Sequence, residues 1–223
     1  MKKIGFITIG QAPRNDIMKD IFPIIEDSIE VLQRGALDNL SGEELKQIAP
    51  GQGDTVLVSS LRDGSCIMMA EEKIIGLLQD CIDELETSGV SGIMLLCTGD
   101  FRNSLSSKVP LIYPNRILRG LIPALCKGET LTVIVPDEEQ KKEAIRQWKN
   151  EGIEINPIAL SPYESDMEAY VQVAEQIKAP DSNYILMDCM GYSRKMKNFV
   201  SESTGKKVIL PRTLSAVILK ELI

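Results

Sequence analysis

The fold is decided by the stretch IMLLCTGD, residues 93–100, and by its echo ILMDCMGY, residues 185–192. Each stretch is an aliphatic run that ends in Cys-x-Gly, at Cys97 in the first and at Cys189 in the second. Self-similarity of this kind indicates a repeated structural unit. The sequence therefore predicts two degenerate copies of one α/β unit, each with a cysteine at the end of a strand.

The surrounding chain alternates between short aliphatic runs and longer amphipathic stretches. The expected strands are Lys3–Ile9, Ile29–Gln33, Thr55–Leu61, Ile93–Cys97, Leu131–Val135, Ile155–Leu160, Ile185–Cys189 and Val208–Leu210. Several runs are apolar throughout, which is typical of parallel strands covered by helices on both faces. The predicted fold class is α/β, with two pseudo-symmetric Rossmann-like lobes, mainly parallel sheets and a cleft between the lobes.

The limits of the lobes follow from the two copies. We expect the first lobe at residues 1–108, completed by residues 206–223, and the second lobe at residues 109–205. Asp63-Gly64 lies between two apolar runs, which is a hairpin signal. Residues 51–70 are therefore expected to form a hairpin added to the first lobe.

Composition excludes several classes of function. The net charge is −7 and no basic block stands out, so no nucleic acid is expected as a partner. No apolar run approaches the roughly 20 residues of a membrane span, and the N-terminus lacks a signal-peptide pattern, so we expect no membrane contact. Five cysteines without metal-like spacing indicate free thiols and a cytoplasmic location.

The chain contains no histidine. This absence removes Ser-His-Asp and Cys-His catalysis and every histidine-ligated metal site. Neither G-x-G-x-x-G nor a Walker motif occurs. We therefore expect no cofactor and no metal.

The two Cys-x-Gly units carry the predicted chemistry. Ligands of parallel α/β proteins bind beyond the carboxyl ends of the strands, where both Cys97 and Cys189 are expected. A helix beginning soon after a cysteine would lower the pKa of its thiol. Two thiols facing one cleft suit stereoinversion, because one removes a proton and the other returns one on the opposite face. The alternative is that they are core residues, as we expect for Cys66, Cys81 and Cys126.

Other polar residues near these strand ends are candidates for ligand binding. Pro13 fits the first position of a helix and places Arg14 in its first turn, where a cation needs a carboxylate partner from the substrate or from Asp16. Asp188 precedes Cys189 in a strand, so its side chain is expected on the opposite face. The expected substrate-binding set is Gln11, Arg14, Thr98, Gly99, Asp100, Met190 and Gly191. Helix capping is the alternative for Thr98 and Asp100, and a solvated loop is the alternative for Gln11.

With these motifs the chain resembles the aspartate/glutamate racemase superfamily, whose members place one catalytic cysteine from each of two lobes across a cleft. The segment TIGQAPRND, residues 8–16, together with MDCMGY, residues 187–192, is more specifically similar to the AroM family. Two departures stand out: no histidine follows Cys189, and Gln11 replaces the family's acidic residue after the first strand.

The resemblance implies a cofactor-independent, isomerase or racemase-like enzyme that acts on a small carboxylate or amino-acid-like ligand. Cys97 and Cys189 would be the proton donor and acceptor. A thiol-dependent decarboxylase or cis–trans isomerase remains open, as does a non-catalytic small-acid sensor. A homodimer also remains open.

Overall fold

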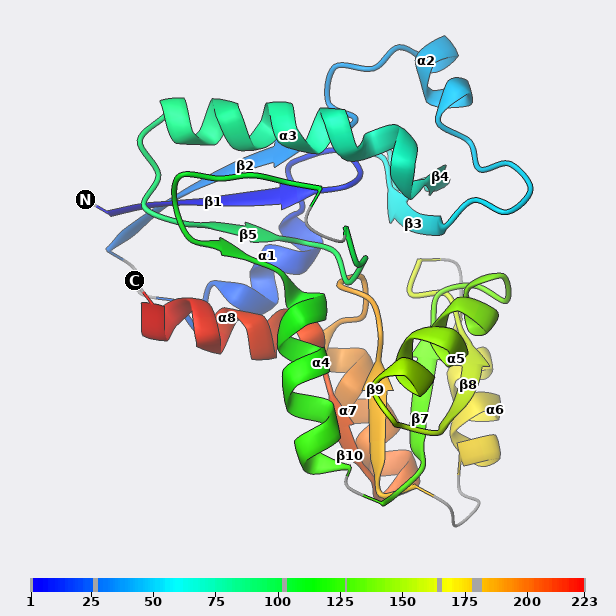
Figure 1. Cartoon of the computed structure of the whole chain (residues 1–223). Helices are drawn as coiled ribbons and strands as arrows, with labels where there is room; N and C mark the ends of the chain where they lie inside the picture. Colours follow the sequence, from blue (N-terminus) through cyan, green and yellow to red (C-terminus); the bar gives the residue numbers. More distant parts are fainter. Residues whose placement is uncertain are drawn as a thin grey trace.

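The computed structural model describes residues 2–25, 28–101, 104–126, 128–163, 166–177 and 182–222. Two four-stranded sheets form the centres of two lobes, and all of their described strand pairs are parallel (Figure 1). The first sheet has the order β2 (Ile29–Gly35), β1 (Lys2–Thr8), β5 (Ile93–Leu95) and β6 (Leu111–Ile112). The second has the order β10 (Lys207–Ile209), β9 (Tyr184–Met187), β7 (Leu131–Val135) and β8 (Ile155–Ala159). The predicted two-lobed α/β fold is confirmed.

Eight helices connect these strands in the described part of the chain. They are α1 (Asn15–Ile21), α2 (Gly42–Gln47), α3 (Glu71–Thr87), α4 (Pro114–Leu125), α5 (Gln140–Asn150), α6 (Met167–Ile177), α7 (Arg194–Thr204) and α8 (Pro211–Leu222). None of them is long and apolar enough to cross a bilayer.

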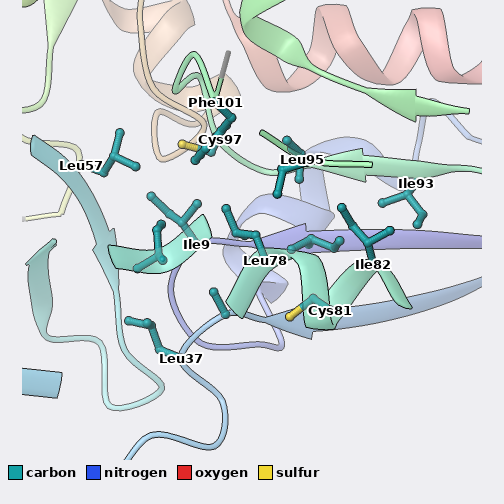
Figure 2. Close-up of a cluster of buried hydrophobic side chains, with 14 of the residues drawn as sticks. Ile9, Leu37, Leu57, Leu78, Cys81, Ile82, Ile93, Leu95, Cys97 and Phe101 are labelled. Atoms are coloured by element: carbon teal, nitrogen blue, oxygen red, sulfur yellow. The ribbon is translucent and has the colours of Figure 1, made fainter. Parts of the chain in front are cut away.

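The first sheet is covered on both faces because its strands alternate their side chains between two apolar clusters. Ile93, Leu95 and Cys97 lie on the side of α3, with its buried residues Leu78 and Ile82 (Figure 2). On the other side, the intervening residues Met94 and Leu96 join a cluster that includes residues of α1 and α8. This two-residue period fixes the direction of Cys97 relative to its strand.

The second sheet is built in the same way. Residues from α4 and α5 pack with Leu131, Val133 and Val135 on one face. Residues from α6 and α7 pack with Ile185, Met187 and Cys189 on the other. The cysteine of each copy therefore continues the buried row of its own strand.

The strand pairing differs from the expected lobe limits at two places. β6 pairs with β5, so the first sheet extends past residue 108. β10 pairs with β9, so residues 207–209 belong to the second sheet and not to the first. Only the following helix, α8, returns to the first lobe, where it contacts α1. The two lobes exchange helices. Helix α4 follows β6 of the first sheet but packs on the second sheet, and α8 follows β10 of the second sheet but packs on the first.

The hairpin within residues 51–70 consists of β3 (Val56–Ser60) and β4 (Cys66–Ala70), which pair antiparallel. Gly64 takes a positive φ of 87° in the turn, a conformation that favours glycine. The hairpin reaches the second lobe, because Gln140 Nε2 on α5 donates to Val56 O at 2.9 Å. It therefore lies across the gap between the lobes.

Candidate functional site

A cavity of about 320 Å³ lies between the two lobes, and both candidate cysteines line it. The first lobe contributes Cys97 and the residues directly after it, together with strand β3. The second lobe contributes Cys189, Tyr163 and part of α5. The topology accounts for this meeting, because β5 and β9 both end at the same gap (Figure 1).

Cys97 is 8% exposed and lies beside Leu57 and Phe101 at the end of the first sheet (Figure 2). Its Sγ accepts a hydrogen bond from the amide of Gly99 at 3.2 Å. A Cβ at Gly99 would lie 3.0 Å from the Phe101 ring, so the tight loop favours glycine. No helix begins at this loop: among the described residues the next helix is α4, so the expected helix dipole is absent. Burial raises the pKa of the Cys97 thiol.

Cys189 has a richer set of partners. Its Sγ accepts from the Gly191 amide at 3.3 Å and lies 3.9 Å from Tyr163 Oη. Burial again raises the pKa of the thiol, while the Gly191 amide, the Tyr163 hydroxyl and the charge of Arg14 oppose that rise. Helix α7 begins at Arg194, five residues after Cys189. Cys189 is therefore the better stabilised of the two thiolates.

The two thiols interact electrostatically. A charge on Cys189 raises the pKa of Cys97, after the larger effect of burial. Each sulfur also accepts a hydrogen bond from the amide two residues later in its own lobe. The repeated Cys-x-Gly motif is thus a repeated piece of local structure.

Asp188 also lines the cavity. Its side chain was predicted on the opposite face of the strand from Cys189, and its carboxyl interacts with Arg119 of α4 and Trp148 of α5, whereas Cys189 packs with residues of α6 and α7. Both residues reach the cavity because β9 ends at Met187, and the Cys189 amide donates to the Met187 carbonyl at 2.8 Å just beyond that end. Burial raises the pKa of the Asp188 carboxyl to about 6, against the opposing contributions of Thr98 and Arg119. Asp188 is a carboxyl poised near neutral pH beside a thiol.

Arg14 does not line the cavity and is the N-cap of α1, not part of its first turn. Its guanidinium is buried and holds Asp16 with two hydrogen bonds of 2.8 and 2.7 Å. It also donates to Ser59 Oγ at 3.2 Å and lies 5.7 Å from the centre of the Tyr163 ring. Its carboxylate partner in this structure is thus Asp16, the protein alternative. Arg14 contacts the Tyr163 ring, and the Tyr163 hydroxyl in turn contacts Cys189.

The other expected substrate-binding residues divide into two groups. Thr98, Gly99 and Asp100 line the cavity, whereas Gln11, Met190 and Gly191 do not. Thr98 and Asp100 do not cap a helix; Thr98 Oγ1 donates to the Asp188 carbonyl at 3.3 Å, and Asp100 pairs with Arg119 at 3.5 Å.

Gln11, Met190 and Gly191 make structural contacts outside the cavity lining. The Gln11 amide joins two loops of the first lobe, donating to Leu37 O and accepting from the Arg62 amide. Met190 is only 2% exposed and belongs to the core between the lobes. Gly191 lies under Tyr163, whose hydroxyl would be 2.6 Å from a Cβ at that position.

Sequence reasoning missed Tyr163 as a site residue. It follows β8 in a loop whose pattern gives no functional signal, and only the fold brings it to Cys189. The described residues contain no group of three or more His, Cys, Asp or Glu side chains that could hold a metal ion.

The two lobes, each built on a parallel sheet, define a two-lobed α/β protein with a thiol-lined cavity between the lobes. The chain belongs to the AroM family, because the family model described as AroM protein matches residues 4–223. The search of curated proteins finds no match.

Solved structures share the fold at low sequence identity. The maleate isomerase Iso from Pseudomonas putida S16 has a TM-score of 0.65 and 16% identity, with 99% of this chain and 92% of that chain covered. The aspartate racemase of Picrophilus torridus has a TM-score of 0.58 and 13% identity, covering 100% of this chain and 94% of that chain. An unliganded arylmalonate decarboxylase also has a TM-score of 0.58 and 13% identity, covering 100% and 91%.

Proposed function

We propose that the protein is a cofactor-independent isomerase or racemase-like enzyme that moves a proton on a carbon next to a carboxylate. The observation that carries this proposal is that Cys97 and Cys189, one from each lobe, line one cavity of about 320 Å³. A cavity of this size suits a small ligand. The neighbouring structures named as a maleate isomerase and an aspartate racemase support a small carboxylate or amino-acid-like substrate.

The reaction conserves atoms and electrons without a redox partner. One thiolate takes a proton from the acidic carbon, and the electron pair left behind delocalises onto the adjacent carboxyl group. The other thiol then gives its proton to the opposite face of that carbon. Inversion results when the two thiols act from opposite sides, and each transfer is general acid–base catalysis.

Cys189 is the proposed proton acceptor and Cys97 the proposed donor. The Gly191 amide, Tyr163 and Arg14 all favour a negative charge on Cys189. Cys97 has one such contact, the Gly99 amide, and Glu71 disfavours a charge there, while Asp188 disfavours a charge on either thiol. Because burial raises both pKa values, Cys189 needs a base when the ligand binds. We assign that role to Asp188, which lines the same cavity.

The unequal thiols also favour a second candidate, a single-thiol reaction such as decarboxylation or cis–trans isomerisation. In such a reaction one cysteine acts alone and the other shapes the cavity. Neighbouring structures named for both reactions have this fold. A non-catalytic acid sensor needs neither thiol.

Solvent deuterium exchange into single enantiomers of small α-substituted carboxylates separates these functions. The wild type should exchange and invert an accepted substrate. Cys97→Ser and Cys189→Ser should each abolish inversion, while either can retain exchange on one face. Cys126→Ser, which removes a buried thiol outside the cavity, is the matched control and should behave as wild type.

Each outcome discriminates among the candidates. Activity that survives in one serine variant but not in the other supports the single-thiol reaction. Ligand-induced thermal stabilisation of the wild type without any exchange or conversion supports the sensor and overturns the enzyme proposal.

A further inference from the structure

Arg212 is a fully buried cation that lies outside the cavity. It is the second residue of α8, only 1% exposed, and reaches the loop that follows Cys189. Its Nε and Nη2 donate to the Met190 carbonyl, and Nη2 also donates to the Gly191 carbonyl at 2.8 Å. Its Nη1 donates to Asp16 O at 3.0 Å and to Asp20 Oδ2 at 2.8 Å. All five N–H groups of the guanidinium are therefore used.

The contact with Met190 has a direct consequence for Cys189. The Met190 carbonyl and the Gly191 N–H belong to the same peptide unit, which is planar. When Arg212 fixes the carbonyl oxygen, it also fixes the direction of the N–H that donates to Cys189 Sγ at 3.3 Å. Arg212 thus fixes the orientation of the Gly191 N–H, which is the hydrogen-bond donor to the Cys189 thiol.

The first lobe contains the same device. Asn115 is the second residue of α4 and 5% exposed, and its Nδ2 donates to the Thr98 carbonyl at 2.9 Å. The Thr98 carbonyl shares a peptide unit with the Gly99 N–H, which donates to Cys97 Sγ at 3.2 Å. Asn115 follows Pro114 just as Arg212 follows Pro211, each at the start of the helix that crosses to the other lobe.

We propose that Asn115 and Arg212 are equivalent positioning residues, each clamping the peptide whose N–H stabilises the thiolate of its own copy. The neutral amide acts on Cys97 and the cation acts on Cys189. This inference rests on the proposed function, in which both thiolates matter. It extends that function by adding two residues that lie outside the cavity to the groups that make the thiols unequal.

The test is the rate at which iodoacetamide alkylates each cysteine at about pH 9, followed by peptide mass spectrometry. Below its pKa a thiol reacts in proportion to its thiolate fraction. Arg212→Lys keeps the charge but loses the planar fork, and should slow Cys189 by roughly tenfold while leaving Cys97 within about twofold. Asn115→Ala should do the converse.

Three further measurements distinguish the proposed effect from a folding defect. Local or global opening would speed the labelling of the buried Cys126, so an unchanged Cys126 rate is required. Asp20→Asn weakens the Nη1 anchor of Arg212 and the bond that the Arg194 amide donates to Asp20 Oδ2, and it should slow Cys189 in the same direction by a smaller factor. Arg194→Lys, an exposed change beside the same aspartate, should leave every rate unchanged.

The proposal is overturned if Arg212→Lys and Asn115→Ala slow both thiols alike, or if neither variant changes the rate of its own thiol. The readout is thiol ionisation, so it holds even for a protein with no turnover. The proposed function fails separately: it is refuted if Cys97→Ser and Cys189→Ser exchange deuterium as the wild type does, even where Asn115 and Arg212 control the alkylation rates as proposed.

Discussion

Gly191→Ala tests the packing behind Cys189 most sharply. A Cβ at this position would lie 2.6 Å from Tyr163 Oη, 2.7 Å from Tyr163 Cζ and 2.8 Å from Pro162 Cγ. Ordinary carbon contacts lie at about 3.5–4.0 Å, so the ring must move by roughly 1 Å. Tyr163 in turn lies 3.9 Å from Cys189 Sγ and carries the guanidinium of Arg14 on its face.

The expected cost combines overpacking with the loss of the ring's contacts. Extra methyl groups in packed sites cost about 1–3 kcal/mol, and the tyrosine of this site is closely surrounded. For a chain of this size, each kcal/mol lowers the melting temperature by roughly 2–4 °C. We therefore expect Gly191→Ala to lower the melting temperature by about 2–12 °C and to slow alkylation of Cys189.

A double-mutant cycle with Tyr163→Ala identifies the cause by urea denaturation. If the tyrosine ring is the obstacle, the added methyl should cost about 0.5 kcal/mol or less in the Tyr163→Ala background. Gly120→Ala is the matched control. Gly120 is an exposed residue in the middle of α4, and a Cβ added there would meet nothing within 4 Å. It should add roughly 0.5–1 kcal/mol of stability. An equal cost of Gly191→Ala in both backgrounds would refute this reasoning.

Two other expectations concern charged groups. Burial raises the pKa of the Asp188 carboxyl to about 6, so the folded state binds this proton more tightly than the unfolded chain. The contribution of Asp188 to stability therefore falls as pH rises from about 4 to 6. Asp188→Asn should remove that slope and add on the order of 2–3 kcal/mol at neutral pH, as checked by urea titrations at several pH values. Arg14→Lys should cost roughly 1–3 kcal/mol in calorimetry, because lysine cannot keep both bonds to Asp16, whereas the more exposed Arg34→Lys should change stability by about 0.5 kcal/mol or less.

Much of the fold could be predicted because its central strands are apolar throughout. Runs such as 93–97 and 131–135 give a strong signal for strands buried on both faces. β6 gives none, because two residues carry no periodicity. The sequence also could not predict which sheet β10 joins, since a sequence pattern identifies a strand but not its neighbours. The exchange of α4 and α8 between lobes is a property of the assembled fold.

The site was predictable only where the chain repeats itself. The matched Cys-x-Gly units led to Cys97 and Cys189, and the structure places both on one cavity. The strand pattern predicted that Asp188 and Cys189 face opposite ways, but not that both would line the cavity, which lies beyond the end of β9. Tyr163 reaches the cavity through tertiary packing alone, which local pattern does not record.

The combination of a symmetrical scaffold with unequal thiols constrains the chemistry. Two-thiol inversion runs in both directions, so the protonated and deprotonated forms of each cysteine must both be reached. Cys189 reaches its thiolate with the help of an amide, a phenol and a nearby cation, against the charge of Asp188, whereas Cys97 has the help of an amide against the charges of Glu71 and Asp188. Abstraction from the Cys97 side is therefore the costlier step when the cavity is empty. A ligand that carries positive charge next to Cys97 would reduce this difference, so the charge of the substrate decides whether the pair works in one direction or in two.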